Sequence, residues 1–214
     1  MIAISTAFKQ ALIAIEIDGQ TNFESLDSNC KHSENMLFAI DKMLDKMDKS
    51  IKDNQHFAVV VGPGSFTGIR IGISLVKGLC AGSHAKRVIP FTTFDLMAYS
   101  YIKNFKPEES FTCIINGLSG YYFICEYSSR GEKLCNEKMV TQQDIASMNN
   151  LVGLAEEKLG DNQVSPTPQH LLELANKKIQ ENQTIESKDL TALYLRKSQA
   201  ESSIDEKNLK KKLV

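Results

Sequence analysis

Residues 57–72 read FAVVVGPGSFTGIRIG, and this stretch decides the fold. Its first five residues form a continuous apolar run, which is typical of a β-strand covered on both faces. A glycine-rich loop follows, and the apolar segment 69–81 predicts a helix. Because a helix N-terminus offers unpaired N–H groups, strand, glycine loop and helix in this order form an arrangement that suits an anion. The loop consists of Gly62, Pro63, Gly64, Ser65, Phe66, Thr67 and Gly68.

Three interpretations of this loop compete. A Walker phosphate loop ends in Gly-Lys followed by Ser or Thr, whereas Gly68 is followed here by Ile-Arg. A dinucleotide-binding fingerprint needs a shorter glycine spacing, and no acidic residue ends the strand expected at 87–93. The third interpretation is a tight strand-to-helix turn, in which glycines allow positive φ and Ser65 or Thr67 caps the helix. The residues favour the tight turn and leave open whether the loop also binds an anion.

The helix expected at 69–81 is apolar around most of its circumference, which predicts burial on more than one side. One side can lie on the sheet, and the other needs a second element or a second chain. Gly72 and Gly78 each cost roughly 1 kcal/mol of helix propensity relative to alanine. We expect glycines here to permit close backbone approach. The apolar residues are Ile69, Ile71, Ile73, Leu75, Val76, Leu79 and Cys80, beside a polar strip of Arg70, Ser74 and Lys77.

The chain before this stretch predicts three strands and one helix. Residues 1–4, 10–17 and 21–26 suit strands, and the turn pair Asp18-Gly19 joins the second strand to the third. Ser33 is a good N-cap for a helix that ends near residue 50. One stripe of that helix is apolar and the opposite side is charged, with Phe38 alone among the charges. The stripe holds Met36, Leu37, Ile40, Met43, Leu44, Met47 and Ile51.

The second half of the chain predicts a smaller lobe. The charged, proline-containing stretch 103–110 reads as a linker, so we expect an N-terminal lobe over residues 1–102 and a smaller C-terminal lobe with a flexible basic tail over 103–214. The elements expected around and after the linker are a helix at 94–101, a hairpin with strands 111–115 and 121–127, helices at 151–159 and 168–180, a short apolar segment at 193–196 and a lysine-rich tail at 207–214.

Composition narrows the class of protein. The chain carries 25 basic and 26 acidic residues, so no overall field favours tight, direct binding to RNA. The cysteine count is odd and no Cys-x-x-Cys pair occurs, which indicates reduced thiols in a cytoplasmic protein. We expect no signal peptide and no membrane span, because no apolar run approaches the roughly 20 residues that a bilayer requires. The five cysteines are Cys30, Cys80, Cys113, Cys125 and Cys135.

The glycine loop and the helix after it closely resemble the signature of the TsaB family, also called YeaZ. The resemblance rests on GPGSFTGIRIG at 62–72 and continues to Lys77-Gly78-Leu79. Three other segments agree in order, and the resemblance covers nearly the whole chain, being strongest at 57–82 and weak from about 103 to 190. These segments are IAISTA at 2–7, HSE at 32–34 before the first helix, and LYLR at 193–196.

The resemblance implies an α/β fold of the actin-like ATPase (ASKHA) type, with two lobes of mixed sheet, flanking helices and a reduced second lobe. It implies a non-catalytic subunit that dimerises with the ATP-binding enzyme TsaD and supports threonylcarbamoylation of the adenosine next to the tRNA anticodon. TsaE belongs to the larger assembly. A free TsaD-binding face would tend to self-associate as a homodimer at high concentration, and the sequence does not decide between homodimer and monomer in isolation. Contact with tRNA is expected to be indirect, and no cofactor, metal or membrane is expected.

In this family the first two helices pack on the matching helices of TsaD. The resemblance therefore implies that the two apolar helix faces described above form a partner interface. The sequence does not decide which residue of each helix meets the partner and which belongs to the core. The expected interface residues are Met36, Leu37, Ile40, Met43, Leu44, Met47, Ile69, Arg70, Gly72, Ile73, Val76, Lys77 and Cys80.

Two positions depart from the family pattern. The opening loop usually carries an aspartate where this chain has Ser5, and in this fold that acid lies near the metal and phosphates. The hairpin commonly reads Asp-Ala-Arg, where this chain has Asn116-Gly117-Leu118. The alternative function is an active phosphotransferase or metallopeptidase of the same fold, against which the missing acid argues. A zinc peptidase needs paired histidines, whereas those present are far apart in sequence. They are His32, His56, His84 and His170.

Overall fold

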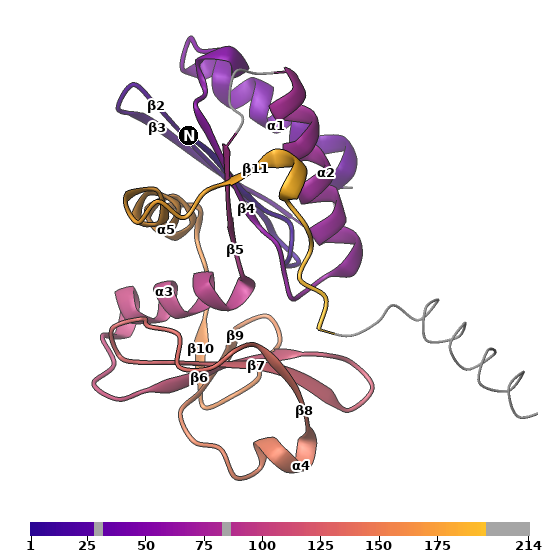
Figure 1. Ribbon diagram of the computed structural model, residues 1–214, viewed down its shortest axis with the longest axis vertical. Coiled ribbons are helices and arrows are strands. Elements are labelled where there is room, and N and C mark those ends of the chain that lie inside the picture. The colour runs from indigo at the N-terminus through magenta and orange to yellow at the C-terminus, as the bar shows by residue number, and fades with distance from the viewer. Residues whose placement is uncertain (28–31, 83–86, 196–214) are drawn as a thin grey trace, which may run out of the picture.

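Two β-sheets lie one above the other in the computed structural model, which describes residues 1–27, 32–82 and 87–195 (Figure 1). One helix, α3 (Thr93–Phe105), lies between the sheets. The helix begins at an N-cap: the Thr92 side chain accepts a hydrogen bond from the Asp95 N–H, and the Asp95 carboxylate accepts one from the Thr92 N–H. Thr92 and Asp95 thus fix where the chain leaves the first sheet.

The first sheet mixes parallel and antiparallel strands. As far as the described residues show, its order is β11-β5-β4-β1-β2-β3. The central strands β1, β4 and β5 are parallel, while β2, β3 and β11 are antiparallel to their neighbours. Positive φ at both Asp18 and Gly19 makes the predicted tight turn between β2 and β3. The strands are β1 (Ile2–Ser5), β2 (Ala11–Ile17), β3 (Gln20–Leu26), β4 (His56–Val60), β5 (Arg87–Phe91) and β11 (Ile185–Glu186).

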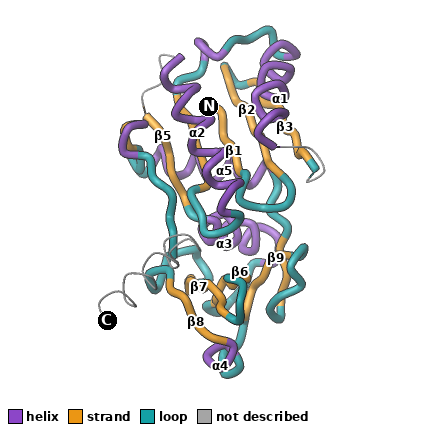
Figure 2. The backbone as a smooth tube through the Cα atoms, turned by 90° about the vertical axis from the view of Figure 1, so that its right-hand side faces the viewer, coloured by secondary structure: helices purple, strands orange, loops and turns teal. Residues whose placement is uncertain are grey.

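Helices cover both faces of this sheet. The helices α1 (His32–Lys46) and α2 (Phe66–Gly82) lie side by side on one face (Figures 1 and 2). The opposite face is covered by α5 (Pro168–Gln180), which contacts β1, β2 and β3. Two 3₁₀ turns, η1 (Ile51–Asp53) and η2 (Ser187–Asp189), contact α2. The central strands are buried on both sides, as the continuous apolar run at 57–61 predicts.

The second sheet is also mixed, with the order β10-β9-β6-β7-β8 in the described part of the chain. Its inner face packs on α3, and the two lobes share one continuous core through this helix. A small separate cluster around Ile114, Ile124 and Leu151 covers part of the outer face. The elements are β6 (Phe111–Asn116), β7 (Tyr121–Tyr127), β8 (Lys138–Thr141), β9 (Leu151–Leu154), β10 (Asn162–Val164) and the short helix α4 (Gln142–Ile145).

The prediction of a helix at 151–159 is wrong. Residues Leu151–Leu154 form β9, a fully buried strand between β6 and β10, and a turn follows. Gly153 lies so close to Leu159 that an added Cβ would overlap the Leu159 carbonyl oxygen. A short apolar run does not distinguish a buried strand from a buried helix, and pairing with distant strands decides this one.

The chain returns to the first lobe after leaving it. Both α5 and β11 belong to the first sheet's layers, although they follow the second sheet in sequence. The division expected between residues 102 and 103 therefore does not correspond to a clean separation in space. Four predicted features lie outside the described residues, namely Cys30, His84, Arg196 and the tail 207–214.

None of the helices in the described part of the chain combines the length and the hydropathy needed to span a bilayer.

Candidate partner interface and glycine loop

The glycine loop is packed against the chain's own backbone. Gly62 and Gly64 have φ values of +116° and +152°, which favour glycine. A Cβ on Gly62 would lie 2.8 Å from the Leu193 carbonyl oxygen, and one on Gly64 would lie 2.7 Å from that of Ala7. The Leu193 N–H also donates to the Val61 carbonyl at 2.8 Å. Both glycines are therefore required by close approach within the chain.

Ser65 caps α2, which confirms the predicted tight strand-to-helix turn. Its Oγ accepts a hydrogen bond from the Gly68 N–H at 3.2 Å, and its carbonyl accepts one from the Ile69 N–H at 2.8 Å. Thr67, the other predicted cap, lies inside the helix.

Three glycines of α2 have different surroundings. A Cβ on Gly68 would overlap the Thr6 carbonyl oxygen, and one on Gly72 would lie 2.5 Å from Thr6 Oγ1. Thr6 Oγ1 in turn donates to the Gly68 carbonyl at 2.7 Å. Gly68 and Gly72 thus let α2 pack on the loop after β1. Gly78 is exposed, and nothing lies within 4 Å of the place where its Cβ would be.

Most residues predicted at the partner interface lie in the chain's own core. They are less than a tenth exposed because the apolar stripes of α1 and α2 face the first sheet. Leu37, Arg70 and Lys77 are the exposed members of the set. The buried members are Met36, Ile40, Met43, Leu44, Met47, Ile69, Gly72, Ile73, Val76 and Cys80.

Cys80 shows how the rest of α2 is covered. Its side chain is hydrogen-bonded with Ser187 of η2, so the C-terminal segment packs on this helix. Burial raises the pKa of the Cys80 thiol, and the Ser187 hydrogen bond opposes this only in part. A thiol of this kind is an inert packing group at neutral pH. Because α2 is apolar around most of its circumference, it needs a second contact besides the sheet. The η2 turn of the same chain supplies one such contact.

The outward sides of α1 and α2 both face the viewer in Figure 2. Two large apolar side chains of α1 are exposed: Leu37 by 46% and Phe38 by 58%. The ammonium group of Lys42 lies 4.4 Å from the centre of the Phe38 ring. On α2 the exposed residues include Ser74, Gly78 and Ala81, which follow one stripe of the helix. The interface predicted from the sequence does not include these three residues, and the glycine inside the helix was the one signal that pointed to them.

Arg70 organises a small aromatic cluster at the start of α2. Its guanidinium lies 3.9 Å from the centre of the Phe66 ring, and its Nε donates to the Tyr194 hydroxyl at 2.8 Å. The two rings are 5.0 Å apart, and all three side chains are exposed. Arg70 thereby attaches the C-terminal segment to the helix and presents a flat cation–aromatic surface beside the loop.

Ser5 and Asn116 mark the two positions at which the sequence departs from the family pattern. Ser5, at the end of β1, is fully buried, and its Oγ has no hydrogen-bond partner among the described residues. The Asn116 N–H donates to the Glu157 carboxylate at 2.9 Å. Burial raises the pKa of Glu157, partly opposed by this hydrogen bond. Within the described ranges, no three His, Cys, Asp or Glu side chains are grouped so as to hold a metal ion.

Comparison with known proteins identifies the family of this chain. The family model described as TsaD, tRNA N6-adenosine threonylcarbamoyltransferase, matches residues 27–163, which is more than half of the chain. The chain belongs to the TsaD family. Within it, the chain groups with TsaB (YeaZ), as predicted from the glycine loop.

Two curated proteins carry the name tRNA threonylcarbamoyladenosine biosynthesis protein TsaB. The one from Escherichia coli is 30% identical over 104 residues, covering 49% of this chain and 45% of that protein. The one from Haemophilus influenzae is 23% identical and covers 92% of this chain and 93% of that protein. The aligned part thus spans under half of the first relative and nearly all of the second.

Solved structures of TsaB-like proteins share the fold. An uncharacterized Pseudomonas aeruginosa protein with similarity to peptidase YEAZ superposes with a TM-score of 0.77 at 20% identity, over 91% of this chain and 98% of that chain. YeaZ from the same organism gives a TM-score of 0.75 at 19% identity, with the same coverage. The expected actin-like ATPase fold of the TsaD family is confirmed.

Proposed function

We propose that the chain is a non-catalytic subunit of tRNA threonylcarbamoyladenosine biosynthesis that dimerises with a TsaD-type enzyme through the outward sides of α1 and α2. The names of its relatives support the pathway. The proposal places the chain in the cytoplasm with TsaE in the larger assembly and with only indirect contact to tRNA. The same surface allows a homodimer when the enzyme is absent.

Gly78 is the observation that carries the proposed interface. A glycine inside a helix costs roughly 1 kcal/mol relative to alanine, and at Gly68 and Gly72 contacts within the chain account for that cost. At Gly78 the space for a Cβ is open and the residue is exposed. Ser74 and Ala81 extend this stripe of small residues along the helix. A helix of a partner chain could lie close against such a stripe, and α1, which packs beside α2, adds the exposed side chains of Leu37 and Phe38 to the surface available to it.

The lack of catalysis is supported by Ser5. The resemblance puts an acid near metal and phosphates at this position, and here a serine is present whose side chain is fully buried. A hydroxyl without access to solvent offers neither a charge nor an open coordination site to a metal–nucleotide complex. We therefore expect the chain alone to turn over no ATP, and the enzyme to supply the chemistry of the complex.

The test is size-exclusion chromatography with light scattering, on the chain alone and mixed with the TsaD-type enzyme of the same organism. We expect a stable heterodimer that Gly78→Gln abolishes at micromolar concentration, because the long side chain fills the space needed by the partner. Thermal unfolding should show that the variant is at least as stable as the parent, since glutamine favours a helix over glycine.

Asn104→Gln is the matched control, because it places the same side chain at an exposed position of α3. This variant should form the complex normally. No heterodimer with the parent chain, or ATP turnover by the chain alone, would reject the proposal. A complex that tolerates Gly78→Gln would instead move the interface to another surface.

A further inference from the structure

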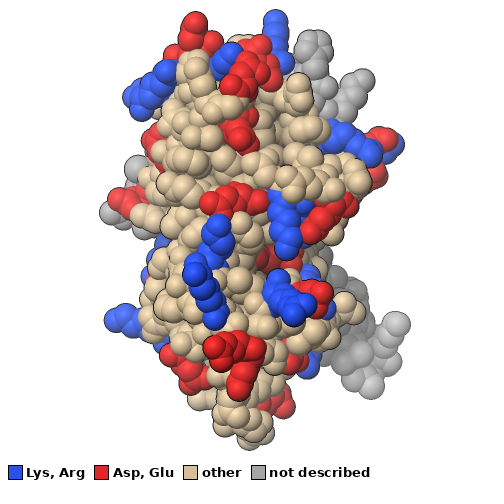
Figure 3. Space-filling model, turned by 90° about the vertical axis from the view of Figure 1, so that its left-hand side faces the viewer, with Lys and Arg blue, Asp and Glu red and all other residues tan. Residues whose placement is uncertain are grey.

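A pocket of about 530 Å³ opens between the two lobes, on the side of the molecule away from α1 and α2. Its walls come from α3, α5 and the turn that follows β7. Figure 3 shows basic and acidic side chains gathered across the middle of this face. The volume falls within the range of about 300–1,000 Å³ that is typical of small-molecule sites.

The pocket has an apolar part and a charged part. Ile102 and Leu174 provide apolar surface beside the ring of Tyr99. The Tyr99 hydroxyl donates to Glu173 at 2.8 Å, and this hydrogen bond holds the ring in place. Among the described lining residues, five are Lys or Arg and three are Asp or Glu. Two of the lysines, Lys103 and Lys133, also form ion pairs at 2.9 and 2.6 Å with Glu173 and Glu137 beside the pocket.

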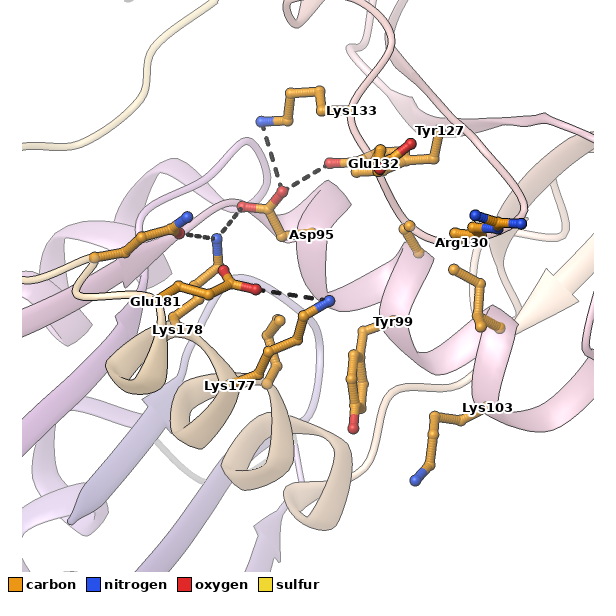
Figure 4. A pocket seen from close by; sticks show the side chains of 15 residues that line it. Asp95, Tyr99, Lys103, Tyr127, Arg130, Glu132, Lys133, Lys177, Lys178 and Glu181 are labelled. Atoms are coloured by element: carbon orange, nitrogen blue, oxygen red, sulfur yellow. Dashed lines mark hydrogen bonds and ion pairs between the residues drawn. The ribbon is translucent and has the colours of Figure 1, made fainter.

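Two of the lysines are already engaged by Asp95. Lys133 and Lys178 lie 3.5 and 3.7 Å from its carboxylate, and the Tyr127 hydroxyl donates to it at 2.9 Å (Figure 4). This network joins both lobes at one end of the pocket. It satisfies Asp95 and engages both lysines, so a ligand has to be met by other cations of the pocket.

Among the cations that line the pocket, Arg130 is the one without a partner in the described part of the chain. Its guanidinium forms no hydrogen bond or ion pair with any described residue, although the backbone that carries it is well fixed. Ser128 Oγ accepts hydrogen bonds from the N–H groups of Arg130 and Glu132, at 3.3 and 3.1 Å. The turn also packs on α3, because a Cβ on Gly131 would lie 3.2 Å from Ile102. Arg130 is thus presented at the pocket by an ordered turn.

Lys177 lines the pocket from α5. Its ammonium group is 3.9 Å from the Glu181 carboxylate, and both side chains are about half exposed, so this pair contributes little. Arg130 and Lys177 therefore offer two weakly engaged cations from two different elements. Arginine pairs with phosphate through two parallel hydrogen bonds, and lysine adds a point charge.

We propose that this interlobe pocket binds a mononucleotide, with the phosphate on Arg130 and Lys177 and the base against Tyr99 and its apolar neighbours. The carboxylate of Glu132 lines the pocket and supplies acceptors for the ribose hydroxyls, as an acidic side chain does in dinucleotide sites. The site differs from the glycine loop, which shares none of these residues. A ligand held by both lobes stabilises their present arrangement, because it binds the folded chain only.

The test is isothermal titration of the chain alone with AMP, with inorganic phosphate and adenosine as separate probes. We expect AMP to bind more tightly than either fragment. Arg130→Ala and Lys177→Ala should each weaken AMP binding by about tenfold or more, since each removes a charged hydrogen-bond donor. Lys52→Ala, which removes the same charge from an exposed site on η1, should leave binding unchanged.

Three results would overturn the proposal: no AMP binding up to about 5 mM, equal affinities for AMP and inorganic phosphate, or AMP binding that both pocket variants retain. Circular dichroism of each variant establishes that it is folded before titration. The outcome is independent of the proposed subunit role, because the titration uses no partner and the heterodimer is tested at α2.

Discussion

Asp95 joins parts of the chain that lie far apart in sequence. Its carboxylate accepts hydrogen bonds from the Thr92 N–H and the Tyr127 hydroxyl, both at 2.9 Å, and faces Lys133 and Lys178. Burial would by itself raise the pKa of Asp95, but the two lysines and the two hydrogen bonds together hold it below the usual value. The ionised carboxylate is therefore the form that stabilises the contact between the lobes.

Asp95→Asn should lower the free energy of unfolding by about 1–3 kcal/mol, measured by urea denaturation at neutral pH, because Lys178 loses its counter-ion and Lys133 is left with Glu137 alone. The pKa is depressed in the folded state, so the stabilisation is present above the unfolded pKa, near 3.8, and is lost as pH falls below it. The parent should therefore lose more stability than the variant when the pH falls from about 5 to about 3.

Asp45→Asn removes an exposed carboxylate of α1 and serves as the control for charge alone. It should change stability by less than about 0.5 kcal/mol. Equal stability of the parent and Asp95→Asn at neutral pH would show that the lobes are held together by the shared apolar core around α3 rather than by this network.

The helix α2 combines three kinds of contact in seventeen residues. Its apolar stripe packs on the sheet, its first glycines pack on the loop after β1, and the exposed side of its last turns is the surface proposed to meet a partner. The sequence predicts the helix well, because a strand, a capping serine and an apolar repeat are local signals. It does not distinguish Gly68 from Gly78, since only the folded chain shows that Thr6 lies against the first and nothing lies against the second.

Alanine at these two glycines should have opposite effects. Gly68→Ala should destabilise the chain by about 1–3 kcal/mol, because the added methyl group overlaps the Thr6 backbone. Gly78→Ala should stabilise the isolated chain by about 0.5–1 kcal/mol, because the methyl group meets nothing and alanine favours the helix. Thermal and urea unfolding of the pair measures both, and two changes of the same sign would contradict this assignment.

The apolar stripe of α1 shows why the sequence could not separate interface residues from core residues. Met36, Ile40 and Met43 repeat at helical spacing, and this repeat predicts an apolar face without saying what covers it. In the folded chain the first sheet covers that face, so those side chains are core. Leu37 lies at the margin of the same stripe and is exposed. The resemblance to a heterodimeric family suggested a partner for residues that the chain buries itself.

Across the whole molecule, the late segment 165–195 completes the first lobe. The helix α5 covers the face of the sheet opposite α1 and α2, and Asn176 donates to Glu16 of β2 at 2.7 Å. The strand β11 pairs with β5, and Leu193 bonds to Val61 beside the glycine loop. The sequence predicts α5 as a capped helix, but no local signal tells which sheet it covers, because that depends on contacts over 150 residues apart.

A chain that ends at residue 164 should not fold cooperatively, because it leaves the apolar face of β1 and β2 open to water. We expect it to bind the dye ANS and to lack a sharp thermal transition. The chain that ends at Leu195 is the control and should unfold like the full chain. A cooperative transition in the shorter chain would show that the first lobe is stable without α5.

This return of the chain has a consequence for its synthesis. A ribosome releases the strands and helices of the first lobe early, but the helix that seals their sheet emerges only after the whole second lobe has been made. Until then the nascent chain exposes the apolar sheet face that α5 covers in the folded protein, and chaperones bind exposed apolar surface of this kind. Slow translation between the two lobes would lengthen that exposure and give aggregation more time to compete with folding.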